Sequence, residues 1–225
     1  MMNRPLHIVY PTRCCACNAF IKSGQVFCDT CKKDIKAIKG KVCKVCFNHK
    51  EYCNCRKTPK WYRRCLAPFE YSGAIKNAAL NLKTLPRADV AAFAAEHIAK
   101  EIAKRFSTYD FDYIVPVPLH FLDKAKRGYN QSLLIAKALS DITGIKVNRR
   151  VLYKKRRRKP QHMLKGKERV VNAKGAYAVR KGISATRVLL VDDIITGGST
   201  VNECAKMLRL AGAKEVYVCS FAKTM

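Results

Sequence analysis

The chain has 225 residues, enough for one ordinary domain and a second small one. Lysine and arginine total 45 against 16 aspartate and glutamate residues, so the formal net charge is +29. Hydrophobic residues make up 48% of the chain, which excludes a disordered basic tail because such tails lack apolar residues. No apolar run approaches the roughly 18 residues that a membrane helix needs, and the start shows no secretory signal. These features predict a soluble, cytoplasmic protein.

Ten of the twelve cysteines fall within residues 1–65, and most of them form closely spaced pairs. A Cys-x2-Cys turn presents two thiolates on one side of a tight knuckle. Two such knuckles complete a tetrahedral shell of four sulfurs, which suits zinc. The spacing predicts two zinc sites, one formed by Cys14, Cys17, Cys28 and Cys31, and one formed by Cys43, Cys46, Cys53 and Cys55.

Other interpretations of these cysteines stay open. Disulfides would need an oxidising compartment, and an iron-sulfur cluster uses the same ligands. Cys15 competes with Cys14 for the first position, and His49 competes for the second site because Cys53-x-Cys55 is an atypical knuckle. Any bound zinc is predicted to be structural, since so small a segment rarely folds without a metal ion or a disulfide.

The composition changes near Pro59, where the cysteine pairs stop and regular structure is discouraged. We therefore expect a Cys-rich zinc-binding module over residues 1–65 and a larger domain over residues 66–225. Residues 73–105 have helical spacing. Residues 113–117 predict a strand that runs into a proline-stiffened loop, and a further helix is expected after Gln131.

The positive charge is concentrated in two blocks. Residues 1–65 carry a net +12 and residues 146–181 a net +14, which leaves +3 for the rest of the larger domain. Such runs are often solvated surfaces, and Trp61 is equally typical of packing between modules. Aromatic residues among cations nevertheless favour nucleic acid, because bases stack on rings while phosphates pair with cations. The predicted DNA-binding residues are Trp61, Arg63, Arg64, Lys154, Lys155, Arg156, Arg157, Arg158 and Lys159.

The most informative stretch is residues 187–200, RVLLVDDIITGGST. The apolar residues 188–191 predict a buried parallel strand, followed at its carboxyl end by Asp192 and Asp193. A turn of glycine and hydroxyl residues leads into a helix whose free N–H groups and dipole attract an anion. Carboxylates that accept from sugar hydroxyls or help to hold Mg²⁺, beside a phosphate-binding turn, predict a site for a phosphorylated sugar.

Residues 188–200 resemble, at all thirteen positions, the phosphoribosyl-pyrophosphate (PRPP) binding motif of type I phosphoribosyltransferases. Together with the cysteine pairs, Val115-Pro-Val-Pro-Leu119 and Arg127-Gly-Tyr-Asn-Gln131, they make the chain similar to the ComF/GntX-like family, which includes competence proteins. The resemblance implies an α/β protein with the type I phosphoribosyltransferase fold, a parallel sheet flanked by helices, preceded by a zinc module. The atypical second knuckle and Arg158-Lys-Pro-Gln161 depart from the family pattern.

The resemblance also implies roles for individual residues. Asp192 and Asp193 are expected to contact the ribose hydroxyls as the catalytic pair, with Mg²⁺ as cofactor and PRPP as substrate. The turn after them is expected to hold the 5-phosphate, the loop after Val117 the pyrophosphate, and residues 153–174 to form a lid that excludes water. The other expected PRPP-binding residues are Thr196, Gly197, Gly198, Ser199, Thr200, Pro118, Leu119, Arg127 and Gln131.

The leading hypothesis is a PRPP- and Mg²⁺-dependent phosphoribosyltransferase that binds single-stranded DNA and acts in DNA uptake during natural transformation. A competence helicase or other DNA-uptake proteins are partners that the resemblance implies. The alternative is a catalytically inactive scaffold of the competence machinery that only binds PRPP. No residue identifies the acceptor. Salvage of an ordinary nucleobase would leave the cysteine module and the charge of +29 unexplained.

Overall fold

The larger domain is built on a parallel sheet, seen in a computed structural model that describes residues 12–106, 110–155, 173, 175–180 and 182–225. Strands β1 (Arg64–Leu66), β7 (Ala213–Lys223), β6 (Ala185–Ile195) and β3 (Tyr113–Pro116) lie side by side in that order. Strand β2 (Phe69–Glu70) pairs with the carboxyl end of β7. All of these pairings are parallel, as the fold class requires.

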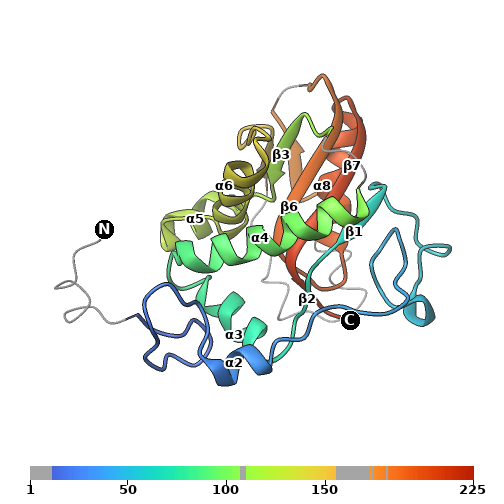
Figure 1. The fold of residues 1–225 in the computed structure, drawn as a ribbon. Coiled ribbons are helices and arrows are strands. Elements are labelled where there is room, and N and C mark those ends of the chain that lie inside the picture. Colours follow the sequence, from blue (N-terminus) through green and yellow to red (C-terminus); the bar gives the residue numbers. More distant parts are fainter. Residues whose placement is uncertain (1–11, 107–109, 156–172, 174, 181) are drawn as a thin grey trace.

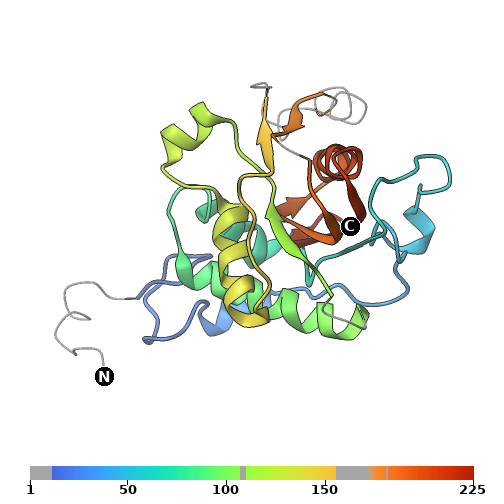
Figure 2. The same cartoon turned by 90° about the horizontal axis from the view of Figure 1, so that it is seen from above.

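Helices cover both faces of this sheet (Figures 1 and 2). Helices α4 (Ala88–Arg105) and α6 (Gln131–Thr143) pack together on one face, and α8 (Ser199–Leu210) covers the other. Covered on both sides, residues 188–191 of β6 are fully buried, which explains why this run is continuously apolar rather than alternating.

The predicted helical segment of residues 73–105 consists of two helices. Helix α3 (Gly73–Asn81) ends before Pro86, and α4 begins at Ala88. Proline lacks an N–H group and restricts the residue before it, so a continuous helix is not possible through this position. Within α4 the predicted apolar face is confirmed as buried, at Ala91, Ala94, Ala95, Ile98 and Ile102.

Smaller elements project beyond the carboxyl end of the sheet. They are α5 (Phe121–Arg127) and a hairpin of β4 (Leu152–Lys154) and β5 (Tyr177–Val179), which are antiparallel (Figure 2). The two strands flank most of the basic segment that the sequence assigned to a lid. Arg156, Arg157, Arg158 and Lys159 lie outside the described residues.

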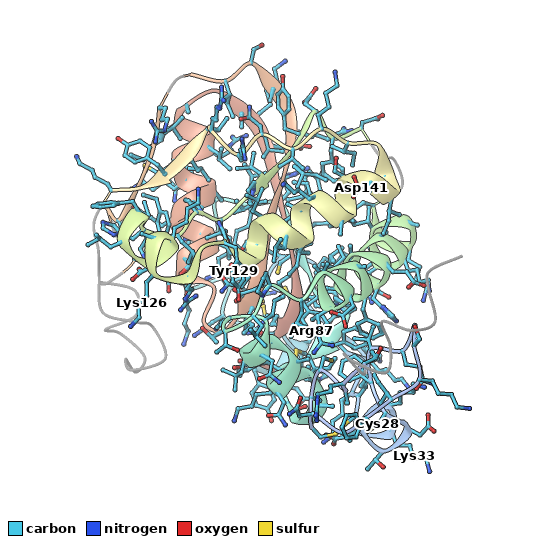
Figure 3. All side chains as sticks on the ribbon, turned by 90° about the vertical axis from the view of Figure 1, so that its left-hand side faces the viewer. Cys28, Lys33, Arg87, Lys126, Tyr129 and Asp141 are labelled. Atoms are coloured by element: carbon cyan, nitrogen blue, oxygen red, sulfur yellow. The ribbon has the colours of Figure 1, made fainter. Side chains whose placement is uncertain are left out.

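The cysteine-rich segment occupies two places on opposite flanks of the larger domain (Figures 1 and 2). The first part, with α2 (Asp29–Lys33), lies beneath α3 and α4, and Figure 3 shows Cys28 below Arg87. Ala74 N donates to Asp34 Oδ2 at 2.7 Å, Asn81 Nδ2 to the Cys15 carbonyl at 2.7 Å, and Arg87 to the Arg13 carbonyl at 3.0 Å. Because these hydrogen bonds join the first part of the cysteine-rich segment to α3 and to the start of α4, this part is docked on the larger domain.

The second part, with the 3-10 helix η1 (Lys50–Tyr52), lies beside β1 on the other flank (Figure 1). The guanidinium of Arg105 stands 4.8 Å from the centre of the Phe47 ring, and Lys223 Nζ donates to Asn48 Oδ1. Strand β1 begins at Arg64, so the sheet starts within one residue of the predicted boundary. The division at residue 65 itself stays a prediction.

Strand β6 is longer than the sequence predicts. Its pairing with β7 continues through Asp192 with Ser220 and Ile195 with Lys223, so both acids lie within the strand, near its carboxyl end, rather than after it. Among the described helices, none combines the length and the apolar character needed to cross a bilayer.

Candidate active site and zinc sites

The carboxyl ends of β3 and β6 meet at one edge of the sheet. Pro116 is paired with Val191, and Val117 N donates to the Val191 carbonyl at 2.8 Å. This register brings the loop of Pro118 and Leu119, both half-buried, next to the acids of β6. The two loops that the sequence assigned to one ligand therefore leave the sheet side by side, at the edge where ligands bind in open α/β sheets.

Asp192 is the buried member of the acidic pair, with 8% of its surface exposed. Ser132 Oγ, at the start of α6, donates to Asp192 Oδ1 at 3.0 Å. Burial raises the pKa of Asp192 well above its usual 3.8, and the adjacent charge of Asp193 raises it further. A carboxyl group held in this way favours an incoming cation, because a cation would stabilise its ionised form.

Asp193 faces a lysine from another part of the chain. Lys83, just after α3, places its Nζ 3.7 Å from Asp193 Oδ2, and both side chains are largely shielded from solvent. The Asp193 N–H donates to Asp192 Oδ1 at 3.0 Å and the Ile194 N–H donates to Asp193 Oδ1 at 2.9 Å, so the backbone orients each carboxyl group. The pair thus has one buried carboxyl group and one that is matched to a cation.

The turn after β6 has the backbone that a phosphate needs. Gly198 caps α8 with a φ of 73°, a left-handed conformation that favours glycine. The amino-terminal N–H groups of the 12-residue helix α8 follow directly. The Tyr62 hydroxyl lies 3.7 Å from the position that a Cβ atom on residue 198 would occupy. Trp61 N donates to Asn202 Oδ1 at 2.9 Å. The segment of Trp61 and Tyr62, which follows the second cysteine group, therefore packs beside this turn.

The start of α6 supports the same edge. Asn130 Nδ2 donates to the Val117 carbonyl at 2.9 Å, and Asn130 Oδ1 accepts from Ser132 N at 3.0 Å. Gln131 is only 2% exposed, and its Nε2 has no hydrogen-bond partner among the described residues. A buried amide without a partner is costly, so this donor supports the assignment of Gln131 to a ligand site.

Lys154 in β4 also turns toward this edge, although the sequence assigned it to DNA. Burial lowers the pKa of Lys154, while the nearby carboxylates of Asp123 and Asp192 oppose that change. Its Nζ lies 5.9 Å from the centre of the Tyr177 ring. Arg127, at the exposed end of α5, is close enough to influence Lys154, and Lys155 is exposed. Lys83 and Lys154 therefore bring positive charge toward the acidic pair, and Arg127 lies near Lys154.

These residues fit PRPP and Mg²⁺. A carboxylate pair matches sugar hydroxyls and a hard cation, the left-handed glycine and helix start match a phosphate, and the cations match a pyrophosphate. The individual assignments of Asp192, Asp193, Thr196, Gly197, Gly198, Ser199, Thr200, Pro118, Leu119, Arg127 and Gln131 stay predictions.

The eight paired cysteines gather into the two groups that their spacing predicts. Within each group the four sulfurs all lie within 4.8 Å of one another. Cys17 Sγ is 3.7 Å from Cys28 Sγ, and Cys46 Sγ is 3.7 Å from Cys53 Sγ. A tetrahedron with zinc–sulfur bonds of about 2.3 Å has edges of about 3.8 Å, so both groups fit zinc. All twelve cysteines are free thiols, which disagrees with the disulfide interpretation.

Backbone N–H groups favour the thiolate form in both groups. Burial tends to raise the pKa of Cys14, but N–H groups, including that of Cys28 at 3.3 Å from Sγ, outweigh burial and lower the pKa to about 6. The balance is similar at Cys43, whose pKa falls to about 7. Thiolates are the form that binds metal, so these hydrogen bonds prepare one ligand in each group, Cys14 in the first and Cys43 in the second.

The two competing ligands lie outside these groups. Cys15 is fully buried in the core, where burial raises its pKa to about 12, and it is the less suitable ligand. His49 caps η1 and is not among the clustered side chains. The Cys53-x-Cys55 knuckle therefore completes the second group despite its unusual spacing.

Comparison with known proteins matches both parts of the chain. A double zinc ribbon domain matches residues 5–59, and a phosphoribosyl transferase domain matches residues 93–225. The DNA utilization protein YhgH of Salmonella typhimurium is 30% identical over 173 residues, which cover 76% of each chain. The chain belongs to the ComF-like family of phosphoribosyltransferase-domain proteins.

Two further likenesses accompany this assignment. Competence protein F of Haemophilus influenzae is 36% identical over 113 residues, 49% of each chain. The purine phosphoribosyltransferase of Pyrococcus horikoshii aligns with 60% of this ComF-like chain and 72% of its own, at 24% identity and a TM-score of 0.35.

The predicted DNA-binding residues of this ComF-like protein divide between two places. Trp61 is 44% exposed and lies against α8, with Lys206 Nζ 5.9 Å from its ring centre. Arg63 and Arg64 instead line a cavity at the amino end of the sheet. Their assignment to DNA stays a prediction.

Several residues of the site escape sequence reasoning. Ser132 precedes Asp192 by sixty residues, and no local pattern pairs a serine with an acid so far along the chain. Tyr62 stands out in sequence only as part of an aromatic and basic run, whereas its hydroxyl lies beside the turn at Gly198. Both contacts depend on how distant segments of the chain pack together, and no local sequence pattern specifies that packing.

Proposed function

We propose that the protein binds PRPP with Mg²⁺ at the carboxyl edge of the sheet and transfers the phosphoribosyl group to an acceptor. The observation that carries this proposal is the buried acidic pair of Asp192 and Asp193, which directly precedes the left-handed Gly198 and the start of α8. In the transfer, the bond from ribose C1 to pyrophosphate breaks, pyrophosphate leaves with the electron pair, and the acceptor supplies the pair for the new bond.

The chain's own residues divide this work. Asp192, held by Ser132, and Asp193, held by Lys83, accept from the two ribose hydroxyls. The turn from Thr196 to Thr200 and the start of α8 bind the 5-phosphate. Bound Mg²⁺ would neutralise pyrophosphate charge, held in part by the carboxylates. The cations of Arg127 and Lys154 face the leaving group, where negative charge develops.

A second candidate is a scaffold that binds PRPP without transferring its ribose. It is favoured by the names of the relatives, which concern DNA utilization and competence rather than transfer. The acidic pair and the turn serve both candidates equally, because both require PRPP to bind. The two differ only in whether the C1 bond breaks.

Release of pyrophosphate separates these two functions. With PRPP, Mg²⁺ and a mixture of nucleobases and single-stranded DNA as acceptors, the wild-type protein is expected to release pyrophosphate above the spontaneous rate. Asp193→Asn should lose about 100-fold or more of that rate, since the carboxylate acts on the reacting ribose. Asp141→Asn, the same change at an exposed position of α6 (labelled in Figure 3), is the matched control and should leave the rate unchanged. Background release from a wild-type protein that still binds PRPP would establish the scaffold.

We also propose that the protein binds single-stranded DNA during DNA uptake in the cytoplasm, with a competence helicase or other uptake proteins as partners. The support is the block of +12 in residues 1–65, the block of +14 in residues 146–181 and the names of the relatives. The proposed contacts are Trp61, Arg63, Arg64, Lys154, Lys155, Arg156, Arg157, Arg158 and Lys159.

Binding to single-stranded DNA should weaken steeply as salt rises. Five phosphate contacts predict a loss of about 100-fold in affinity between 50 and 200 mM salt. The reason is that the lysine and arginine side chains of the protein release counterions condensed on the DNA, and added salt opposes this release. Anisotropy of a labelled dT oligomer over that range measures the slope. An affinity that stays flat across the range would remove the electrostatic basis of the proposal.

A further inference from the structure

A cavity of about 370 Å³ lies at the amino end of the sheet, away from the acidic pair. Its size is within the range of small-ligand sites. Arg187, which lines it, precedes Asp192 by five residues on β6, so a strand rise of about 3.3 Å per residue separates the two by roughly 17 Å. The cavity is therefore distinct from the proposed PRPP site.

Three aromatic rings form one part of its lining. Phe106 follows α4, Phe111 precedes β3, and Tyr217 lies on β7. The ring centres of Phe106 and Phe111 lie 5.1 and 5.3 Å from that of Tyr217, both in edge-to-face geometry. Phe106 and Phe111 are buried, while Tyr217 is half-buried. Tyr217 is thus the ring best placed to offer its surface to a ligand.

Two guanidinium groups of the lining share one acid. Glu215 accepts from Arg187 Nε at 3.1 Å and lies 3.1 Å from Arg63 Nε, and it also accepts from the Tyr217 hydroxyl at 3.1 Å. Arg187 pairs in addition with Asp110 at 3.4 Å. These contacts fix the two arginines in place beside the ring.

Two other cations of the lining lack such a partner. Arg64 donates to the carbonyl of Arg105 at 2.9 Å, and Lys44 comes from the second zinc ribbon. Within the described parts of the chain, no carboxylate lies within 4.0 Å of either charged group. Both side chains are exposed. The cavity therefore combines an aromatic wall with two uncompensated positive charges.

We propose that this cavity binds one nucleotide of a single DNA strand, with the base against Tyr217 and its phosphate between Arg64 and Lys44. Only a ligand that joins a flat ring to an anion uses both kinds of lining, and a nucleotide is such a ligand. The inference rests on the proposed binding of DNA and gives it a location. It places the nucleotide between the second zinc ribbon and the sheet, at a site separate from the proposed PRPP site.

Reversing the two free charges tests this location. The double variant Lys44→Glu, Arg64→Glu should weaken binding of a dT oligomer at 100 mM salt by 10-fold or more. The control Lys76→Glu, Lys137→Glu changes the total charge equally at exposed positions of α3 and α6, outside the cavity, and should weaken binding less than 3-fold. Zinc content and melting temperature show that both variants are folded. Equal losses in the two variants would overturn the location.

Photocrosslinking of the wild-type protein locates the base without any substitution. A dT oligomer that carries 5-iododeoxyuridine should crosslink to the peptide containing Tyr217, with the yield unchanged by saturating PRPP. Crosslinks confined to residues 153–174, or lost with PRPP, would contradict the proposal while leaving DNA binding intact. Absence of any binding to the oligomer would instead remove the proposed function. If dTMP competes as well as the oligomer, a free nucleotide is the ligand and the strand assignment is wrong.

Discussion

Replacement of Asp192 by asparagine is expected to make the free protein more stable at pH 7 while destroying its site for PRPP. The buried carboxyl group of Asp192 has a raised pKa because burial and Asp193 oppose its charge. Asparagine keeps an oxygen for Ser132 and carries no charge, so unfolding should cost about 1–2 kcal/mol more, a rise of roughly 2–8 °C in melting temperature. Calorimetry of the two proteins measures this difference.

The gain should depend on pH in a defined direction. The pKa of Asp192 in the folded state lies above its unfolded value of 3.8, so the folded protein holds this proton more tightly. Below pH 3.8 the carboxyl group is neutral in both states and the substitution should matter least. As the pH rises above 3.8, folding must take up a proton, and the advantage of asparagine should grow. A variant less stable than wild type at pH 7 would show that the ionised carboxylate is instead stabilised by its surroundings.

Replacement of Cys17 by serine is expected to remove one zinc and to destabilise the protein by about 3–5 kcal/mol. Cys17 is exposed, and a change at an ordinary exposed position is usually worth less than about 0.5 kcal/mol. A large effect here would therefore come from the loss of a metal ligand. The first ribbon is docked on α3 through Asp34, so its loss should also weaken that contact. Metal analysis should fall from two zinc ions per chain to one.

The neighbouring Cys15 provides the control for that experiment. Cys15→Ala removes a buried thiol that lies outside both sulfur groups, so the protein should keep two zinc ions whatever the packing cost. If Cys17→Ser also keeps two zinc ions, or if Cys15→Ala loses one, the ligand assignment is wrong. Iron in the purified protein would identify a different metal in the same sulfur shell.

The sequence predicts those features whose chemistry is local. Cysteine pairs, a buried apolar strand and a glycine turn are each specified by neighbouring residues, and the structure assembles them as expected. The separation of α3 from α4 is also local, because Pro86 marks it, but helical spacing on both sides of the proline conceals it. The length of β6 is not local, since pairing with β7 extends it through the acids.

Features that depend on contacts between distant parts of the chain cannot be predicted in this way. The hydrogen bond from Ser132 to Asp192 and the ion pair of Lys83 with Asp193 join residues from different parts of the chain. The cavity at the other end of the sheet depends on Tyr217 pairing with Arg64 in the parallel register. The same applies to the two ribbons, because nothing in the spacing of the cysteines indicates that they dock on opposite flanks of the sheet (Figure 1).

Titration of PRPP into the protein by isothermal calorimetry, with and without Mg²⁺, tests the central claim most directly. One PRPP should bind per chain in the presence of Mg²⁺, binding should weaken strongly when Mg²⁺ is removed, and Asp192→Asn should abolish it while Asp141→Asn does not. The carboxyl edge of the sheet would not be a PRPP site if the wild-type protein failed to bind PRPP with Mg²⁺, or if Asp192→Asn bound it with unchanged affinity.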